Sequence, residues 1–249
     1  MLHGREAILG GIRTALGREG ACVAPEALPR FSCDAPFAPD EDIVGRFCEE
    51  VERVGGRVAR VESGEEIREY LGRLLSLEAN PVVAVTDDAA VESSGVREWL
   101  AGSGARLVPT LREFVSHASN TSTAGNADDV RPSADEYKRA LLRAHVGVTS
   151  AEYAIAETGT LVLVSGSSQQ RLISLLPPVH VCLLNPSRIK AGMGDLLARV
   201  RAEFDPGPTP PQAMTFITGP SCTADIEQTL VRGMHGPREL HVLLSPSAR

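Results

Sequence analysis

The sequence predicts an α/β fold with a Rossmann-like three-layer sheet, and three observations support this prediction. Segments with the patterns of strands and helices alternate from residue 57 to the end of the chain. Two of the strand segments, residues 81–86 and 178–184, are almost continuously apolar, as strands buried on both faces are. Hydrophobic residues make up 43% of the 249 residues, which suits one domain with an ample core. Such alternation implies parallel strands joined by right-handed crossovers.

Charge and hydropathy exclude several classes of protein. The formal net charge of −7 argues against a nucleic-acid partner held by counterion release. No apolar run approaches the roughly 20 residues that a membrane helix needs. The start of the chain carries charged residues where a signal peptide would have an apolar core. We therefore expect a cytoplasmic protein without a membrane span.

The first 39 residues predict an N-terminal extension. Residues 2–16 place apolar side chains at helical spacing, and Gly17 is a suitable end for such a helix. The following segment is rich in proline and has no sustained period, so we expect an extended connector. The expected organisation is a helix and connector over residues 1–39 and one α/β domain over residues 40–249.

The main domain is expected to begin with a helix at residue 40. Acidic residues at its start favour the positive end of the helix dipole, and Gly55 and Gly56 end it. A second helix follows the next strand, where Ser63 is a suitable N-cap and Glu66 occupies the capping-box position. These signals predict where the first two helices of the alternating pattern begin.

The polar segment 119–133 has too few apolar side chains to offset its ordering entropy, so we expect a mobile loop there. The other expected elements are strands at 57–61, 81–86, 106–108, 146–149, 153–156, 160–164, 178–184, 214–218 and 239–244, and helices at 94–100, 135–144 and 192–204, with a short helix starting at 169–171.

A charged turn at Glu157 lies between two of these strands. Strands on both sides leave its carboxylate at the rim of the sheet, where it could act on a ligand or hydrogen-bond one. The alternative is that the carboxylate only caps the turn by accepting backbone N–H bonds. We take Glu157 as the catalytic candidate. The ligand-binding candidates around it are Thr158, Gly159, Thr160 and Ser165.

A glycine- and serine-rich loop at 165–168 follows, and its backbone offers a cradle for a ligand. The Arg171 guanidinium is suited to a carboxylate or phosphate, and the glutamine amides before it donate and accept hydrogen bonds. The alternative for Arg171 is an ordinary solvated side chain. The ligand-binding candidates of this segment are Gly166, Gln169, Gln170 and Arg171.

A second candidate wall follows the strand at 214–218. Gly219 and Pro220 predict a turn, and Ser221 and Thr223 are suitable caps for a helix after it. Asp225 would lie in the first turn of that helix, and the N–H groups at such a helix start bind anions. The alternative is a capped helix without a ligand, because the glycines and lysine of the specific phosphate-binding motifs are absent.

The cysteines and histidines do not predict a metal site. Five scattered cysteines form no CxxC pair, which argues against zinc or an iron–sulfur cluster bound by this chain alone. No HxH, HxxxH or HExxH pattern occurs, and no nicotinamide or flavin motif, so the cofactors stay unknown. His180 lies in an apolar strand and is most simply a core histidine with one nitrogen satisfied. His235 either reaches the strand ends or closes a loop.

Three segments, AIAETGTLVL, QRLISLLPPVHV and FITGPSCTADIEQTLVRGMHGPREL, resemble signature segments of the lactate utilization protein C family, whose members carry the LUD domain. The resemblance covers roughly residues 40–245. It implies a fold similar to the sugar-phosphate isomerase and CoA-transferase superfamily (NagB/RpiA/CoA transferase-like). This chain departs from the family's usual pattern at Cys222, where arginine is usual.

The resemblance also implies a function. It implies a component of an L-lactate utilization system that oxidises L-lactate to pyruvate with iron–sulfur partner proteins. The residues described above add the expectation of a small carboxylate or phosphate ligand at strand ends. The Glu157 turn looks like the glutamate turn of CoA transferases, whose carboxylate is a nucleophile. The alternatives are a stand-alone enzyme on a sugar-phosphate or CoA-linked substrate and a scaffold protein without turnover.

Overall fold

The computed structural model describes residues 10–11, 14, 42–114, 134–165, 171–204, 213–224 and 230–246. Contacts divide the chain into two units, Met1–Asp34 and Ala35–Arg249. In the first unit, residues 10, 11 and 14 are helical, and the rest of the predicted helix lies outside the described residues. The connector up to residue 41 and the predicted mobile loop at 119–133 also lie outside them. The predicted domain boundary therefore stays a prediction.

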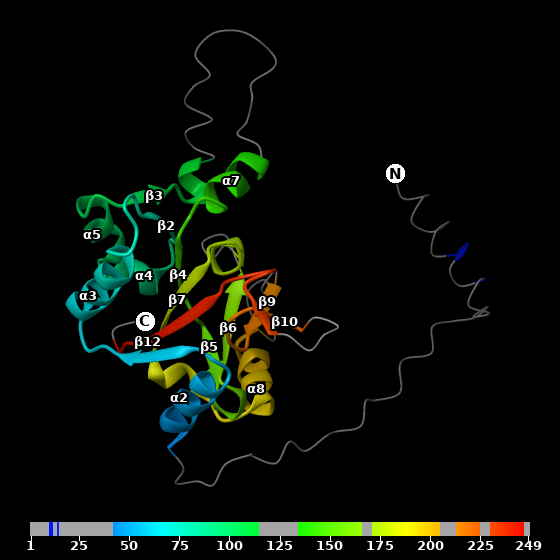
Figure 1. Ribbon diagram of the computed structural model, residues 1–249. Coiled ribbons are helices and arrows are strands. Elements are labelled where there is room, and N and C mark those ends of the chain that lie inside the picture. Colours follow the sequence, from blue (N-terminus) through cyan, green and yellow to red (C-terminus); the bar gives the residue numbers. More distant parts are fainter. Residues whose placement is uncertain are drawn as a thin grey trace. The chain divides into compact units, whose positions relative to one another are not determined.

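The second unit is built on a six-stranded sheet whose strand order is β1-β12-β7-β4-β2-β3 (Figure 1). Every neighbouring pair is parallel. This sheet confirms the predicted α/β fold. Its strands are β1 (Arg57–Arg60), β2 (Val82–Val85), β3 (Arg106–Val108), β4 (Val146–Ser150), β7 (Val179–Leu184) and β12 (Glu239–Leu244).

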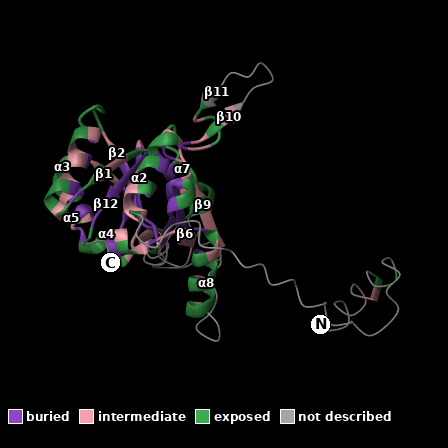
Figure 2. Cartoon of the chain, turned by 90° about the horizontal axis from the view of Figure 1, so that it is seen from below, coloured by how far each residue is buried: buried purple, intermediate pink, exposed green. Residues whose placement is uncertain are grey.

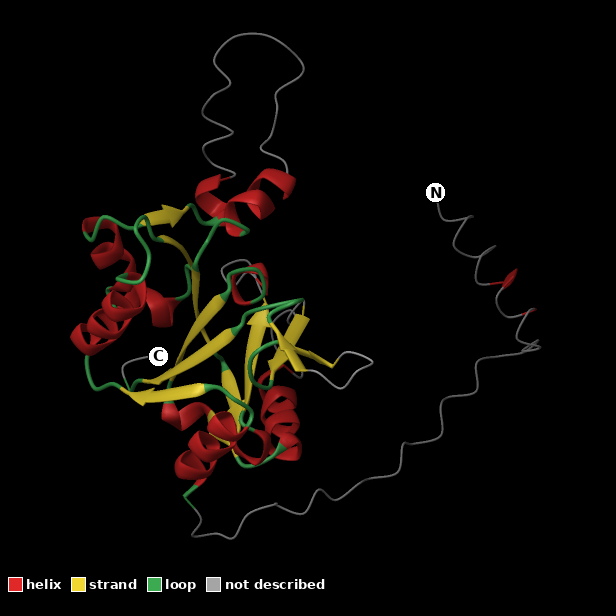
Figure 3. Cartoon of the chain, in the orientation of Figure 1, coloured by secondary structure: helices red, strands yellow, loops and turns green. Residues whose placement is uncertain are grey.

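Helices cover one face of this sheet (Figure 3). They are α3 (Gly64–Leu75), α4 (Ala89–Ser93) and α5 (Val96–Gly102), and their apolar residues pack on alternate residues of the strands, such as Val181 and Leu183. The predicted cap of α3 is confirmed, because the Ser63 hydroxyl accepts a hydrogen bond from the Glu66 N–H at 3.3 Å. Capping of this kind supplies an acceptor for an N–H group that has none inside the helix.

The opposite face packs against three further elements. They are α2 (Ile43–Arg53), α7 (Ala134–Leu141) and a second sheet, and Cys182 and Leu184 of β7 point to this side. Figure 2 shows the buried residues gathered in the strands between these layers. Separate clusters of buried apolar residues therefore lie on both faces of the central sheet.

The second sheet has four strands in the order β8-β5-β6-β9, with α8 (Met193–Phe204) packed on it. The two strands on either side of the Glu157 turn, β5 and β6, pair antiparallel within this sheet and do not join the central one. The strands are β5 (Tyr153–Ile155), β6 (Thr160–Ser165), β8 (Ile189–Lys190) and β9 (Ala213–Ile217).

The prediction of a helix after Pro220 is wrong. The chain forms an antiparallel hairpin there, from β10 (Cys222–Ala224) and β11 (Leu230–Arg232). Backbone bonds fix its base, since the Ser221 N–H donates to the Pro237 carbonyl at 2.8 Å and the Gly233 N–H donates to the Ser221 carbonyl at 2.9 Å. These hydrogen bonds between separate segments of the chain take the place of the hydrogen bonds that a helix would form. Ser221 and Thr223 are therefore not helix caps, and Asp225 lies outside the described residues.

Candidate functional site

The Glu157 turn is held rigidly although its side chain is exposed. Residues Ala156–Thr158 form one 3₁₀ turn, and Gly159 follows in the left-handed conformation with φ of 61°. A Cβ on Gly159 would lie 2.5 Å from the Val51 backbone nitrogen of α2, so only glycine fits. The Glu157 N–H donates to the Ala191 carbonyl at 3.0 Å. Within the described part of the chain its carboxylate has no hydrogen-bond partner, so it does not cap the turn.

Three threonine hydroxyls run from this turn toward the end of β9. The Oγ1 atoms of Thr158 and Thr160 lie 2.6 Å apart, and those of Thr160 and Thr218 lie 2.7 Å apart. Thr160 is buried, whereas Thr158 and Thr218 are exposed. The chain of hydroxyls brings the predicted residues of the turn together with the loop that contains Gly219.

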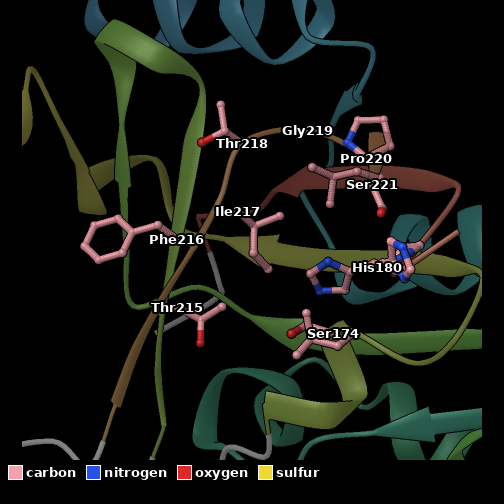
Figure 4. A pocket seen from close by; sticks show the side chains of 14 residues that line it. Ser174, His180, Thr215, Phe216, Ile217, Thr218, Gly219, Pro220 and Ser221 are labelled. Carbon is pink, nitrogen blue, oxygen red and sulfur yellow. The ribbon is translucent and has the colours of Figure 1, made fainter. Parts of the chain in front are cut away.

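A pocket of about 210 Å³ begins at Thr218 (Figure 4). It lies between the carboxyl end of β9 and the amino ends of β7 and β12. The predicted residues Gly219, Pro220 and Ser221 are part of its lining. The full lining is Ser174, Leu175, His180, Thr215, Phe216, Ile217, Thr218, Gly219, Pro220, Ser221, His235, Gly236, Pro237 and Leu240.

His180 is the titratable group most deeply buried in this pocket. Figure 4 shows its ring between Ile217 and Ser174. The side chain is 1% exposed, and its Nε2 lies 2.9 Å from the Thr149 hydroxyl. Its Nδ1 is buried and has no hydrogen-bond partner among the described residues. Burial, and then the neighbouring His241, lower the pKa of His180 to about 3, so the ring is neutral near pH 7.

Three exposed arginines lie close in the sequence to residues that line the pocket, and none of them is itself part of the lining. Arg171 begins the 3₁₀ turn Arg171–Ser174, whose last residue lines the pocket, and the Ser174 hydroxyl donates to the Arg171 carbonyl at 2.9 Å. Arg232 and Arg238 stand on either side of the segment that contains His235. None of these three arginines forms an ion pair within the described ranges.

Two of the remaining predicted site residues, Ser165 and Thr223, are described and do not line the pocket. Ser165 pairs with Ala213, at the far end of β9 from Thr218. Thr223 lies within the hairpin, opposite Val231. Gly166, Gln169, Gln170 and Asp225 lie outside the described residues.

Sequence reasoning missed that His180 and Ser174 line the pocket, and it left open whether His235 reaches the strand ends or closes a loop. A histidine in an apolar strand has the same pattern as a core residue, and Ser174 and His235 come from distant segments. The only available signal was a polar residue that faces the same side of β7 as the buried Cys182.

Two absences concern only the part of the chain that the structure describes. No group of three or more His, Cys, Asp or Glu side chains there could hold a metal ion. No helix there is both long and apolar enough to cross a membrane.

Comparisons with known proteins agree with this architecture. The chain matches the family model of the LUD domain over residues 44–245. A crystal structure of a DUF162 family protein from Deinococcus radiodurans has a similar fold, with a TM-score of 0.50 and 20% sequence identity. The similarity covers 82% of this chain and 96% of that chain.

Several relatives carry the name lactate utilization protein C. The protein from Bacillus pumilus (strain SAFR-032) is 26% identical over 246 residues, which are 96% of this chain and 96% of that protein. The protein from Geobacillus sp. (strain WCH70) is 40% identical over 95 residues, which are 38% of this chain. The stronger match therefore spans only 39% of that relative's length.

Proposed function

Because the chain belongs to the LUD domain family, we propose that it is a component of an L-lactate utilization system and binds a small carboxylate in the pocket around His180. The name of the relatives supports the first part of this proposal. The single observation that carries the second part is the pocket itself, whose wall brings the predicted residues Gly219, Pro220 and Ser221 together with His180 and His235. Concave sites with a few convergent polar groups are where small ligands bind.

The size and lining of the pocket support a small acid. Pockets for drug-sized ligands occupy roughly 300–1,000 Å³, and this one has about 210 Å³. The hydroxyl of Ser221 and the imidazole of His235 add polar groups to its wall. We expect a carboxylate at its mouth to meet Arg171, which starts the 3₁₀ turn that ends at Ser174 in the pocket wall. A phosphate of similar size would fit the same place.

Glu157 is proposed as the group that acts on the ligand from the rim. The threonine hydroxyls connect its turn to Thr218 in the pocket wall. A carboxylate without a protein partner is free to hydrogen-bond the hydroxyl of a 2-hydroxy acid or to accept its proton. Arg171, at the start of the neighbouring 3₁₀ turn, is proposed to pair with the acid's carboxylate.

The partners are proposed to be iron–sulfur proteins of the same lactate utilization system. Oxidation of L-lactate to pyruvate releases two electrons, and the sequence carries no nicotinamide or flavin motif that would take them. An electron carrier on another chain would complete the reaction.

A strain lacking the gene, complemented with Glu157→Gln or Arg171→Gln, tests the proposal by growth on L-lactate. A pull-down of each variant measures the retention of iron–sulfur partners. We expect growth to fail while the partners are retained. Normal growth of both variants would contradict a ligand role for these residues, and loss of the partners would assign them to an interface instead.

A stand-alone enzyme on a sugar-phosphate or CoA-linked substrate is the second candidate. The Arg171 guanidinium, which has no ion pair within the described ranges, favours it, because arginine binds phosphate in a bidentate manner. The helix start on which phosphate binding was expected is replaced by a hairpin, and the pocket is small for CoA. Binding of CoA or a sugar phosphate to the isolated chain, without binding of lactate, would support this candidate.

A further inference from the structure

Two glycines line the pocket, and a side chain on each would point in a different direction. A Cβ on Gly219 would lie 2.9 Å from the Cγ2 of Val54, at the end of α2 and outside the lining. A Cβ on Gly236 would lie 3.1 Å from the Cβ of Ser221 and 3.9 Å from the Leu175 carbonyl oxygen, and both of these residues line the pocket. Gly236 is therefore the glycine whose missing side chain leaves space on the pocket side.

The space beside Gly236 separates two walls of the pocket. Ser221 belongs to the loop that leads from β9 into the hairpin, whereas Leu175 follows the 3₁₀ turn that ends at Ser174. Figure 4 shows Ser221 above the ring of His180 and Ser174 below it. A single methyl group at position 236 would already touch atoms of both walls, because its distances to them are those of van der Waals contact or shorter.

The backbone around Gly236 is fixed on both sides. The Ser221 N–H donates to the Pro237 carbonyl at 2.8 Å, and the Arg238 N–H donates to the Pro178 carbonyl at 2.7 Å. The φ of Gly236 is not positive, so an alanine can adopt the same backbone conformation. An added side chain would therefore take its space from the pocket, since the segment that carries it is held in place.

We propose that Gly236 sets the upper size of the acid that this pocket admits. This inference rests on the proposed function, since it assumes that the pocket binds a small acid. The pocket has about 210 Å³, and its apolar lining includes Ile217 and Leu240. In a hydrophobic pocket, one methylene of the ligand changes the affinity by about 10–200-fold. A methyl group at position 236 should therefore reject a longer 2-hydroxy acid before it rejects L-lactate.

Calorimetric titrations of the full chain with L-lactate and with L-2-hydroxybutyrate, which is one methylene longer, test the size limit. We expect Gly236→Ala to weaken the binding of L-2-hydroxybutyrate at least about tenfold more than that of L-lactate. Gly102→Ala is the matched control. Gly102 ends α5 and has no atom within 4 Å of the position of a Cβ, so this variant should change neither affinity.

Variants of Ser221 test the same space from the opposite wall. Ser221→Gly removes the Cβ and the Oγ that a methyl group at position 236 would meet at 3.1 and 3.3 Å. This variant widens the gap, so we expect it to shift the affinity ratio toward L-2-hydroxybutyrate. Combining it with Gly236→Ala should return the ratio toward that of the wild type. Thermal unfolding shows whether each variant is folded.

The possible failures are distinguishable. An unchanged affinity ratio in a folded Gly236→Ala, including an equal weakening of both acids, would overturn the role of Gly236 while leaving the pocket as an acid site. If Gly236→Ala does not fold, Ser221→Gly decides, and an unchanged ratio in that variant would overturn the size limit. Binding of neither acid to the wild type would overturn the ligand of the proposed function and the size limit with it.

Discussion

The hydroxyl oxygens of Thr160 and Thr218 lie 2.7 Å apart, and this contact joins the Glu157 turn to the pocket around His180. Thr160 begins β6 and Thr218 follows β9, so the contact closes the end of an antiparallel strand pair. A carboxylate at the turn and a buried imidazole in the pocket wall are thereby parts of one region. This arrangement gives predictions for each part separately.

Glu157→Gln should leave the fold unchanged and weaken ligand binding or turnover by about tenfold or more. The reason is that its exposed carboxylate has no partner in the described residues, so its loss removes only a contact to the ligand. Calorimetry with L-lactate and growth on L-lactate measure the effect. Glu98 is an exposed glutamate on α5, and Glu98→Gln is the matched control, which should change neither lactate binding nor growth. Equal behaviour of the two variants would remove Glu157 from the site.

Gly159→Ala should lower the free energy of unfolding by more than about 2 kcal/mol. Its Cβ would meet the backbone of α2 at 2.5 Å, and its φ of 61° is unfavourable for alanine. Gly104 has φ of 83° with nothing within 4 Å of the position that a Cβ would take, so Gly104→Ala isolates the conformational cost of about 1–2 kcal/mol. Urea unfolding measures both. Equal losses of unfolding free energy in Gly159→Ala and Gly104→Ala would mean that the contact of residue 159 with α2 is not tight.

Tyr137→Phe should leave stability unchanged or raise it by up to about 1 kcal/mol. The ring is 5% exposed, and its hydroxyl has no partner in the residues that the structure describes. Tyr153→Phe is the contrasting variant, because the Tyr153 hydroxyl donates to the Glu203 carboxylate, and its loss should cost about 1–2 kcal/mol. Thermal unfolding distinguishes them. A loss of stability in Tyr137→Phe as large as that in Tyr153→Phe would mean that the Tyr137 hydroxyl has a hydrogen-bond partner.

Acid should destabilise the protein through His180. Its pKa is about 6.5 in the unfolded chain and about 3 in the fold, so below pH 6.5 the unfolded chain binds the proton first. The stabilisation by the neutral ring is complete above pH 6.5 and is lost as the pH falls toward 3, at up to about 1.4 kcal/mol per pH unit. His180→Gln should flatten this decline in urea unfolding between about pH 7 and pH 5. Burial also lowers the pKa of His241, so part of the decline should remain. An equally steep decline in the variant would refute the assignment to His180.

Local signals predicted the main sheet well. The apolar runs became β2 and β7, and the Ser63 cap with Glu66 started α3, because burial on both faces and capping are properties of short segments. The second sheet and the hairpin at Cys222 were not predicted. Whether a short strand pairs with one sheet or another, or replaces a helix, depends on distant partners such as Pro237.

The site was predictable only where the sequence interrupts an apolar pattern. The Glu157 turn and the Gly219 loop stand out because charge and glycine break strand segments. His180 did not stand out, because its place in the pocket depends on contacts made only in the fold, and its partner Thr149 is 31 residues away along the chain. The pocket itself arises from segments that only folding brings together.

Titration of the nitrogen-15-labelled chain with L-lactate tests the central claim most directly. We expect saturable shift changes concentrated at the pocket, in His180, in residues 215–221 and in residues 235–237, with the Glu157 turn following through Thr218. No saturable change, or changes confined to surfaces away from these residues, would contradict the claim that this pocket binds the acid.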